Sequence, residues 1–155
     1  MIVKIKFSFK ENKIFYAGGI IDAMCDVRSL KNGRRKKNEV VKSIPSGKPY
    51  DPEHFPKGEW NISKSIPKTD KYLAPFFIPT DAIRPVKVWH LDDHGNYDAE
   101  TREVVIDGAY GLHYSESSTT HGCIRIVNKL DLINLKDWCD AQIKAGFKVH
   151  LIVEE

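Results

Sequence analysis

The residues best suited to chemistry lie in one short segment, residues 117–126. It reads Ser-Ser-Thr-Thr-His-Gly-Cys-Ile-Arg-Ile, so four hydroxyl residues lead into a histidine, a glycine, a cysteine and an arginine. His121 and Cys123 are two positions apart, and on an extended backbone their side chains project to the same face. His113, ten residues before the cysteine, can fold back over it. A thiol beside imidazoles and a guanidinium ionises readily, and the thiolate is the nucleophile of cysteine acyl transfer.

Two neighbours of Cys123 supply further functions that acyl transfer needs. Gly122 lets the backbone come close to a substrate carbonyl, and the amides beside it can stabilise a tetrahedral oxyanion. Arg125 is two residues beyond Cys123, so its side chain can reach the same face. Its planar guanidinium can bind a substrate carboxylate through two parallel hydrogen bonds. We therefore predict a cysteine acyl-transfer site.

A metal ion is the rival use of the same side chains. His113, His121 and Cys123 are the kinds of ligand that catalytic zinc sites use, with a fourth position left open. Arg125 argues against this use, because a second cation beside a divalent ion is unfavourable. The prediction is a site without a metal ion or an organic cofactor.

Strands must position most of this site. Alternation of apolar and polar residues, bounded by turn residues, predicts strands at residues 2–9, 14–17, 20–27, 59–62, 86–91, 103–106, 110–113 and 147–153. Lys10–Lys13 predicts a hairpin turn, and Asp92–Asn96 predicts another turn. We expect a mostly β domain of sandwich-like or barrel-like architecture.

One helix is expected near residues 129–145. Asn128 can cap its first turn, Asp131 favours the positive end of the helix dipole, and Gly146 can end it. An apolar face at roughly helical spacing is predicted from Leu130, Ile133, Leu135, Trp138, Ala141 and Ile143.

All eight prolines lie between Ser43 and Pro85. This segment has too much proline for helices and too many aromatic residues for a disordered linker, so it predicts long ordered loops with short strands. Such loops can shape a binding cleft, or they can simply cover the sheet. Both interpretations stay open at this point.

The composition bounds the class of protein. A chain of 155 residues predicts one domain, residues 1–155, and its net charge of +3 gives no reason to expect nucleic acid. There is no apolar run long enough for a membrane span, and the N-terminal residues lack the core and cleavage site of a classical signal peptide. Cys25, Cys123 and Cys139 form neither a disulfide framework nor a zinc pattern. Cys25 and Cys139 are expected to be packed thiols, and the protein is expected to be a monomer.

A family resemblance adds to this prediction. Thr120-His121-Gly122-Cys123-Ile124-Arg125 resembles the active-site signature of L,D-transpeptidase catalytic domains of the YkuD type. His113 matches the separate upstream histidine of that family, and residues 108–112 resemble the segment before it. Phe55–Trp60 loosely resembles an upstream glycine-containing region. The specific part of the resemblance covers about the last fifty residues of the chain.

The resemblance implies a role for each matched residue. Cys123 would be the nucleophile, His113 would accept its proton, and His121 would support the geometry. The amides of Gly122 and Cys123 would form the oxyanion site, and Thr120 and Arg125 would help to bind the donor peptide. The separation of ten residues between His113 and Cys123 is shorter than is usual in the family, so His121 remains the alternative base.

The resemblance also implies a substrate. Members of the family attack a diaminopimelate carbonyl in a tetrapeptide stem of peptidoglycan, release D-alanine and pass the acyl group to an amine, or to water in an L,D-carboxypeptidase. Their setting is the cell envelope, the periplasm or the outside of the cell, and without a classical signal peptide the export route is open. A secreted effector that targets the cell wall, a zinc hydrolase and a non-catalytic module that binds stem peptides are the remaining alternatives.

Overall fold

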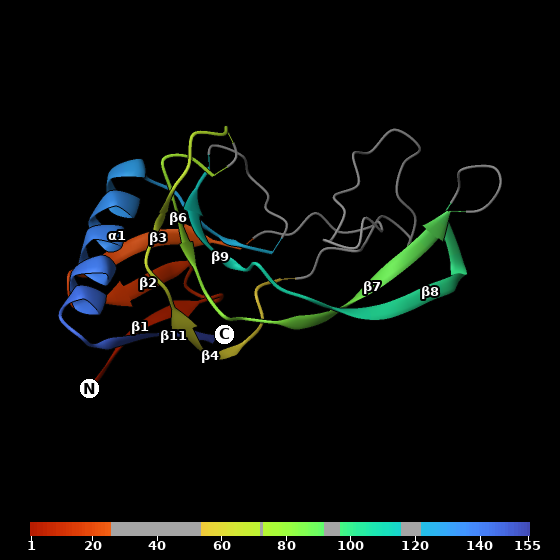
Figure 1. The fold of residues 1–155 in the computed structure, drawn as a ribbon, viewed down its shortest axis with the longest axis horizontal. Helices are drawn as coiled ribbons and strands as arrows, with labels where there is room; N and C mark the ends of the chain where they lie inside the picture. Colours follow the sequence, from red (N-terminus) through yellow and green to blue (C-terminus); the bar gives the residue numbers. More distant parts are fainter. Residues whose placement is uncertain (26–53, 72, 92–96, 116–121) are drawn as a thin grey trace.

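The structure is a computed structural model, and it describes residues 1–25, 54–71, 73–91, 97–115 and 122–155. In this part of the chain a curled sheet of nine strands packs against one helix, and a separate ribbon of two strands extends away from it (Figure 1). The prediction of a mostly β fold with a helix near residues 129–145 is therefore confirmed.

The nine strands follow the order β4-β11-β1-β2-β3-β10-β9-β6-β5 across the sheet. Their bounds are β1 (Ile2–Ser8), β2 (Lys13–Tyr16), β3 (Gly19–Met24), β4 (Gly58–Ile62), β5 (Ile66–Pro67), β6 (Phe76–Pro79), β9 (Gly111–Tyr114), β10 (Ile124–Ile126) and β11 (Lys148–Glu154). The ribbon consists of β7 (Arg84–Leu91) and β8 (Tyr97–Asp107), paired antiparallel. The predicted turn at Asp92–Asn96 and the predicted end of the third strand at Val27 lie outside the described residues.

The first two strands form the predicted hairpin, and β3 extends it into an antiparallel meander. β1 pairs with β2 through Phe7 and Ile14, and β2 pairs with β3 through Ile14 and Ile21. These three side chains are buried and lie on one face, because paired residues of neighbouring strands project to the same side. The final strand, β11, returns to lie parallel with β1, so the two ends of the chain share one sheet.

Helix α1 (Lys129–Lys144) covers the apolar face of the sheet (Figure 1). Its start is as predicted: the Asn128 side chain accepts hydrogen bonds from the backbone N–H groups of Leu130 and Asp131, at 2.8 and 3.2 Å. Its end is also as predicted. Gly146 has a φ of +91°, which turns the chain out of the helix toward β11.

The predicted apolar face of the helix was partly wrong. The buried residues are Leu132, Leu135 and Cys139, whereas Leu130 is 62% exposed and Ala141 is also exposed. Apolar residues are spread widely around this helix, so their spacing does not define which side meets the sheet. The stripe at positions 132, 135 and 139 faces the strands and fills the core.

The proline-rich segment contributes more strand than expected. β4 was predicted, but β6 was not, although β6 lies between β5 and β9 and joins the main sheet. Among the described residues, no helix is both long and apolar enough to cross a membrane.

Candidate active site

The candidate site is built on the parallel pair β9 and β10. Arg125 pairs with His113, and Ile124 pairs with Leu112. The Ile124 and Leu112 side chains are fully buried in the core. Because side chains alternate along a strand, His113 and Arg125 share the opposite face of the sheet. Cys123 stands just before β10, two residues from Arg125, and its thiol contacts the backbone that leads into β9.

Neighbouring strands extend this row of side chains. Arg125 also pairs with Met24 of β3, and His113 also pairs with Phe77 of β6. A thioether, a guanidinium, an imidazole and an aromatic ring therefore occupy adjacent positions across four strands. Adjacent strands are about 4.8 Å apart, so these side chains form a continuous band.

His113 has the environment of an oriented base. The residue is buried, with 7% of its surface exposed. Its Nδ1 lies 3.0 Å from the backbone oxygen of Tyr114. A carbonyl oxygen only accepts hydrogen bonds, so this contact holds the proton on Nδ1 and leaves the lone pair on Nε2. Nε2 is then the atom that can take a proton from a thiol.

Cys123 is half-buried at the start of β10. Its Sγ lies 3.8 Å from the backbone oxygen of Ala109, within the range of a weak thiol hydrogen bond. Ala109 has a φ of +61°, a left-handed conformation that costs a residue other than glycine about 1–2 kcal/mol. The backbone that faces the thiol is thus strained, as is common at functional sites.

Gly122 adopts a conformation that glycine favours. Its φ is +114°, and it is buried directly before the predicted nucleophile. Its carbonyl accepts a hydrogen bond of 3.3 Å from the thiol of Cys25, and the same sulfur accepts one of 3.3 Å from the Phe55 amide. Cys25 was predicted to be a packed core residue, and it is buried as expected.

Arg125 makes structural contacts that the sequence did not indicate. Its Nη1 donates to the backbone oxygen of Ser115 at 3.2 Å, and its Nη2 lies 3.1 Å from the Met24 sulfur. Its Nε is buried and has no hydrogen-bond acceptor among the described residues. Arg125 therefore ties β10 to β3 and to the end of β9, in addition to its predicted place beside Cys123.

Phe77 and Gly111 are site residues that sequence reasoning missed. A Cβ added to Gly111 would lie 2.4 Å from the Phe77 ring and 2.4 Å from the Ile78 backbone oxygen. The aromatic ring therefore lies directly over Gly111, next to His113 on the same strand. The only signal in the sequence was a glycine two positions before a candidate catalytic histidine.

Two predicted site residues, Thr120 and His121, lie outside the described residues. Their predicted roles therefore stay predictions, as does the zinc alternative that needs His121. Within the described part of the chain, no group of three or more His, Cys, Asp or Glu side chains is arranged to hold a metal ion.

Cys139 differs from Cys123 in its surroundings. It lies on the buried side of α1, and burial raises the pKa of its thiol to about 12, with a smaller contribution from the Asp140 carboxylate. A thiol that stays protonated near neutral pH is a poor nucleophile. Cys139 is a packed residue, as the sequence indicated.

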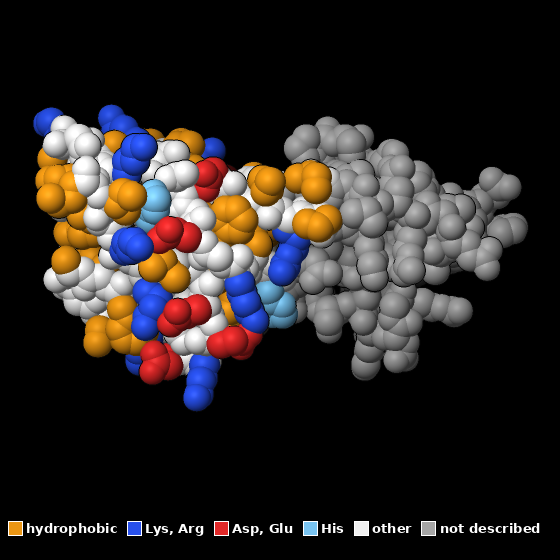
Figure 2. Space-filling view, turned by 90° about the horizontal axis from the view of Figure 1, so that it is seen from below, with side chains coloured by type: hydrophobic (Ala, Val, Ile, Leu, Met, Phe, Trp, Pro, Cys, Tyr) orange, Lys and Arg blue, Asp and Glu red, His pale blue; other side chains and the backbone are white. Residues whose placement is uncertain are grey.

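Surface charges are mixed rather than concentrated. On the face that Figure 2 shows, positive and negative side chains are interspersed. Lys4 pairs with Glu59 at 3.1 Å, and Lys6 pairs with Glu154 at 3.3 Å. The hydrogen bond from Lys4 lowers the pKa of Glu59. The described part of this face therefore shows no basic patch for an anionic polymer.

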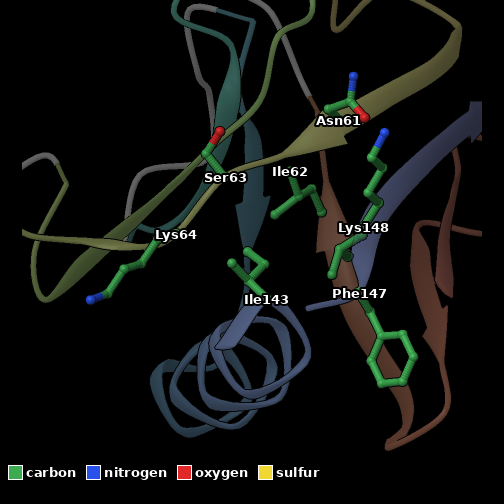
Figure 3. A pocket seen from close by; sticks show the side chains of 8 residues that line it. Asn61, Ile62, Ser63, Lys64, Ile143, Phe147 and Lys148 are labelled. Atoms are coloured by element: carbon green, nitrogen blue, oxygen red, sulfur yellow. The ribbon is translucent and has the colours of Figure 1, made fainter. Parts of the chain in front are cut away.

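A separate cavity of about 510 Å³ lies between the end of β4, the end of α1 and the start of β11 (Figure 3). Its lining combines the apolar residues Ile62, Ile143 and Phe147 with Lys64 and Lys148. None of the predicted catalytic residues lines it, so it is distinct from the candidate active site.

No family model, curated protein or solved structure matches this chain. The case for its function therefore rests on its own residues and on their geometry.

Proposed function

We propose that this protein is a cysteine acyltransferase that acts on peptide stems of peptidoglycan, as an L,D-transpeptidase that works through a Cys123 thioester. Two features support the proposal. The segment Thr120–Arg125 resembles the transpeptidase signature. The parallel pairing of β9 with β10 sets His113 beside Arg125, and Cys123 stands directly before β10.

The pairing is the observation that carries the proposal. His113 and Cys123 belong to separate segments of the sequence, and nothing local obliges them to meet. The pairing of Arg125 with His113 brings the two segments together, and Cys123 is two residues before Arg125, so we propose that the imidazole and the thiol meet. The Nδ1 contact of His113 also directs Nε2, the basic atom, away from its own backbone.

The proposed reaction has two stages. Nε2 of His113 takes the thiol proton, and the thiolate attacks the carbonyl of the donor stem. The carbon–sulfur bond forms, the carbon–nitrogen bond breaks, and the proton passes from the imidazolium to the departing D-alanine amine. An acceptor amine then attacks the thioester, loses its proton to His113 and releases the Cys123 thiol. Water in place of the amine gives carboxypeptidase activity.

The resemblance supports a setting for this reaction. Peptidoglycan lies outside the cytoplasmic membrane, so we propose that the protein acts in the cell envelope or after secretion. A secreted effector that targets the cell wall fits the same chemistry.

Intact mass measurement with a carbapenem tests the proposed nucleophile. A thiolate opens the β-lactam by attack on its carbonyl, and the whole drug then remains attached as a thioester. We expect one adduct on the wild type and on Cys139→Ala, and none on Cys123→Ala. The absence of an adduct on the wild type would contradict acyl transfer and would favour a non-catalytic binding module. A requirement for added zinc would favour the metal alternative.

Purified muropeptides distinguish the possible reactions. A crosslinked product with loss of D-alanine identifies a transpeptidase, and a shortened stem alone identifies a carboxypeptidase. Cys123→Ala should give neither product.

A further inference from the structure

The buried thiol of Cys25 makes two contacts that bear on the nucleophile. It donates to the Gly122 carbonyl and accepts from the Phe55 amide, both at 3.3 Å, and only 3% of its surface is exposed. A thiol in the core usually packs as a small apolar group. Here it instead links β3, the residue before Cys123 and a segment that precedes β4.

The hydrogen bond from Cys25 to the Gly122 carbonyl determines the orientation of the Gly122–Cys123 peptide group. Among the described residues the only cis peptide is Ala74–Pro75, so the Gly122–Cys123 peptide is trans. In a trans peptide the C=O and the N–H point in opposite directions. The Gly122 carbonyl points at Cys25, which belongs to the hydrophobic core. The Cys123 amide N–H therefore points away from Cys25.

The direction of this N–H has a chemical meaning. When a thiolate attacks a carbonyl, negative charge develops on the carbonyl oxygen, and a donor already aimed at that oxygen lowers the barrier. The amide of the nucleophilic residue itself lies close to that position. The Cys25 hydrogen bond holds this peptide in place.

We propose that Cys25 is a positioning residue for acyl transfer, whose thiol fixes the Gly122–Cys123 peptide so that the Cys123 N–H serves the oxyanion. The proposal rests on the proposed role of Cys123 as an acyl-accepting nucleophile, but it does not depend on the identity of the natural substrate. Cys25 would act only through the peptide group that it orients, and it would not itself bond to the substrate.

Two reagents that react with the same sulfur test this role. With p-nitrophenyl acetate, the thiolate attacks the ester carbonyl, passes through an oxyanion and expels p-nitrophenolate to leave an acetyl thioester. With iodoacetamide, the thiolate displaces iodide, and no oxyanion forms. The ratio of the acylation rate to the alkylation rate therefore reports oxyanion stabilisation separately from thiol reactivity and access. Cys123→Ala supplies the background for both rates.

We expect Cys25→Ala to lower this ratio by at least about tenfold, since removal of one oxyanion donor costs roughly 100- to 1,000-fold in related chemistry. Cys25→Ser keeps a donor and an acceptor, so it should restore most of the ratio. Cys139→Ala is the matched control, because it removes the other buried thiol and should leave the ratio unchanged. If Cys25→Ala does not fold, Cys25→Val fills the same space without a donor and carries the same test.

The outcomes separate this proposal from the proposed function. Three outcomes would overturn the role of Cys25. The ratio could be unchanged in Cys25→Ala, both rates could fall equally, or the ester could fail to acylate the wild type. A ratio that falls as expected, in a protein that leaves carbapenem and muropeptides unaltered, upholds Cys25 and contradicts the peptidoglycan substrate.

Discussion

His113 shows how much one backbone contact can decide at the scale of a residue. The family resemblance favoured His113 as the base, but the short separation from Cys123 left His121 as an alternative. The hydrogen bond from Nδ1 to Tyr114 specifies a tautomer for His113 and so the atom that accepts a proton. Tautomer and burial depend on the folded surroundings, which a single sequence does not display.

The two histidines can be separated by substitution. We expect His113→Ala to lower the rate of Cys123 acylation by roughly 100-fold or more, the usual contribution of a positioned general base. His121→Ala should have a smaller effect if it only supports the geometry. Stopped-flow measurement of acylation by a carbapenem checks both. His150→Ala, on β11, is the control. A larger loss in His121→Ala than in His113→Ala would reverse the two roles.

At the scale of elements, turns and helix ends that depend on neighbouring residues were predicted well, and pairings between distant strands were not. The turn at Lys10–Lys13, the Asn128 cap and the stop at Gly146 depend on neighbouring residues, so the sequence contained them. Strand β6 begins at Phe76 and ends at Pro79, and it has no alternation that predicts a strand. It forms because β9 offers it an edge to pair with. The parallel alignment of β9 with β10 is likewise a property of the sheet.

The close contact between β6 and β9 gives a test of this pairing. Gly111→Ala would press a methyl group against the Phe77 ring and the Ile78 carbonyl, and the backbone atom cannot rotate away. We expect a loss of about 1–3 kcal/mol in the free energy of unfolding, together with slower acylation of Cys123. Gly108→Ala is the matched control, because its Cβ would come no closer than 3.9 Å to Ile83. Urea unfolding measures the stability of both variants. Equal losses in Gly111→Ala and Gly108→Ala would contradict the close contact at Gly111.

At the scale of the whole molecule, one sheet serves two purposes. Its inner face packs on Leu132, Leu135 and Cys139 of α1 and supplies the core. The opposite face of β9 and β10 displays His113 and Arg125. The sequence indicated the β content and the helix, because alternation and caps are local. The curl of the sheet and the side of the helix that it buries depend on the packing of the complete chain.

The core beneath the helix should make stability sensitive to alkaline pH. Burial raises the pKa of Cys139 from an ordinary 9.0 to about 12. Below about pH 9 both the folded and the unfolded chain keep this proton. Between about pH 9 and pH 12 the unfolded chain loses it while the folded chain retains it, so the contribution to stability falls as the pH rises. Each unit of pH in this window costs up to about 1.4 kcal/mol.

Cys139→Val isolates this contribution, because valine has a similar volume and does not titrate. Urea unfolding at about pH 8 and about pH 10.5 should show that the wild type loses about 2 kcal/mol more than the variant across this interval. The other thiols and the lysines are common to both proteins, so their titration cancels in the comparison. Equal losses in the two proteins would mean that the Cys139 thiol is not held protonated by the fold, and that the helix does not seal this part of the core from water.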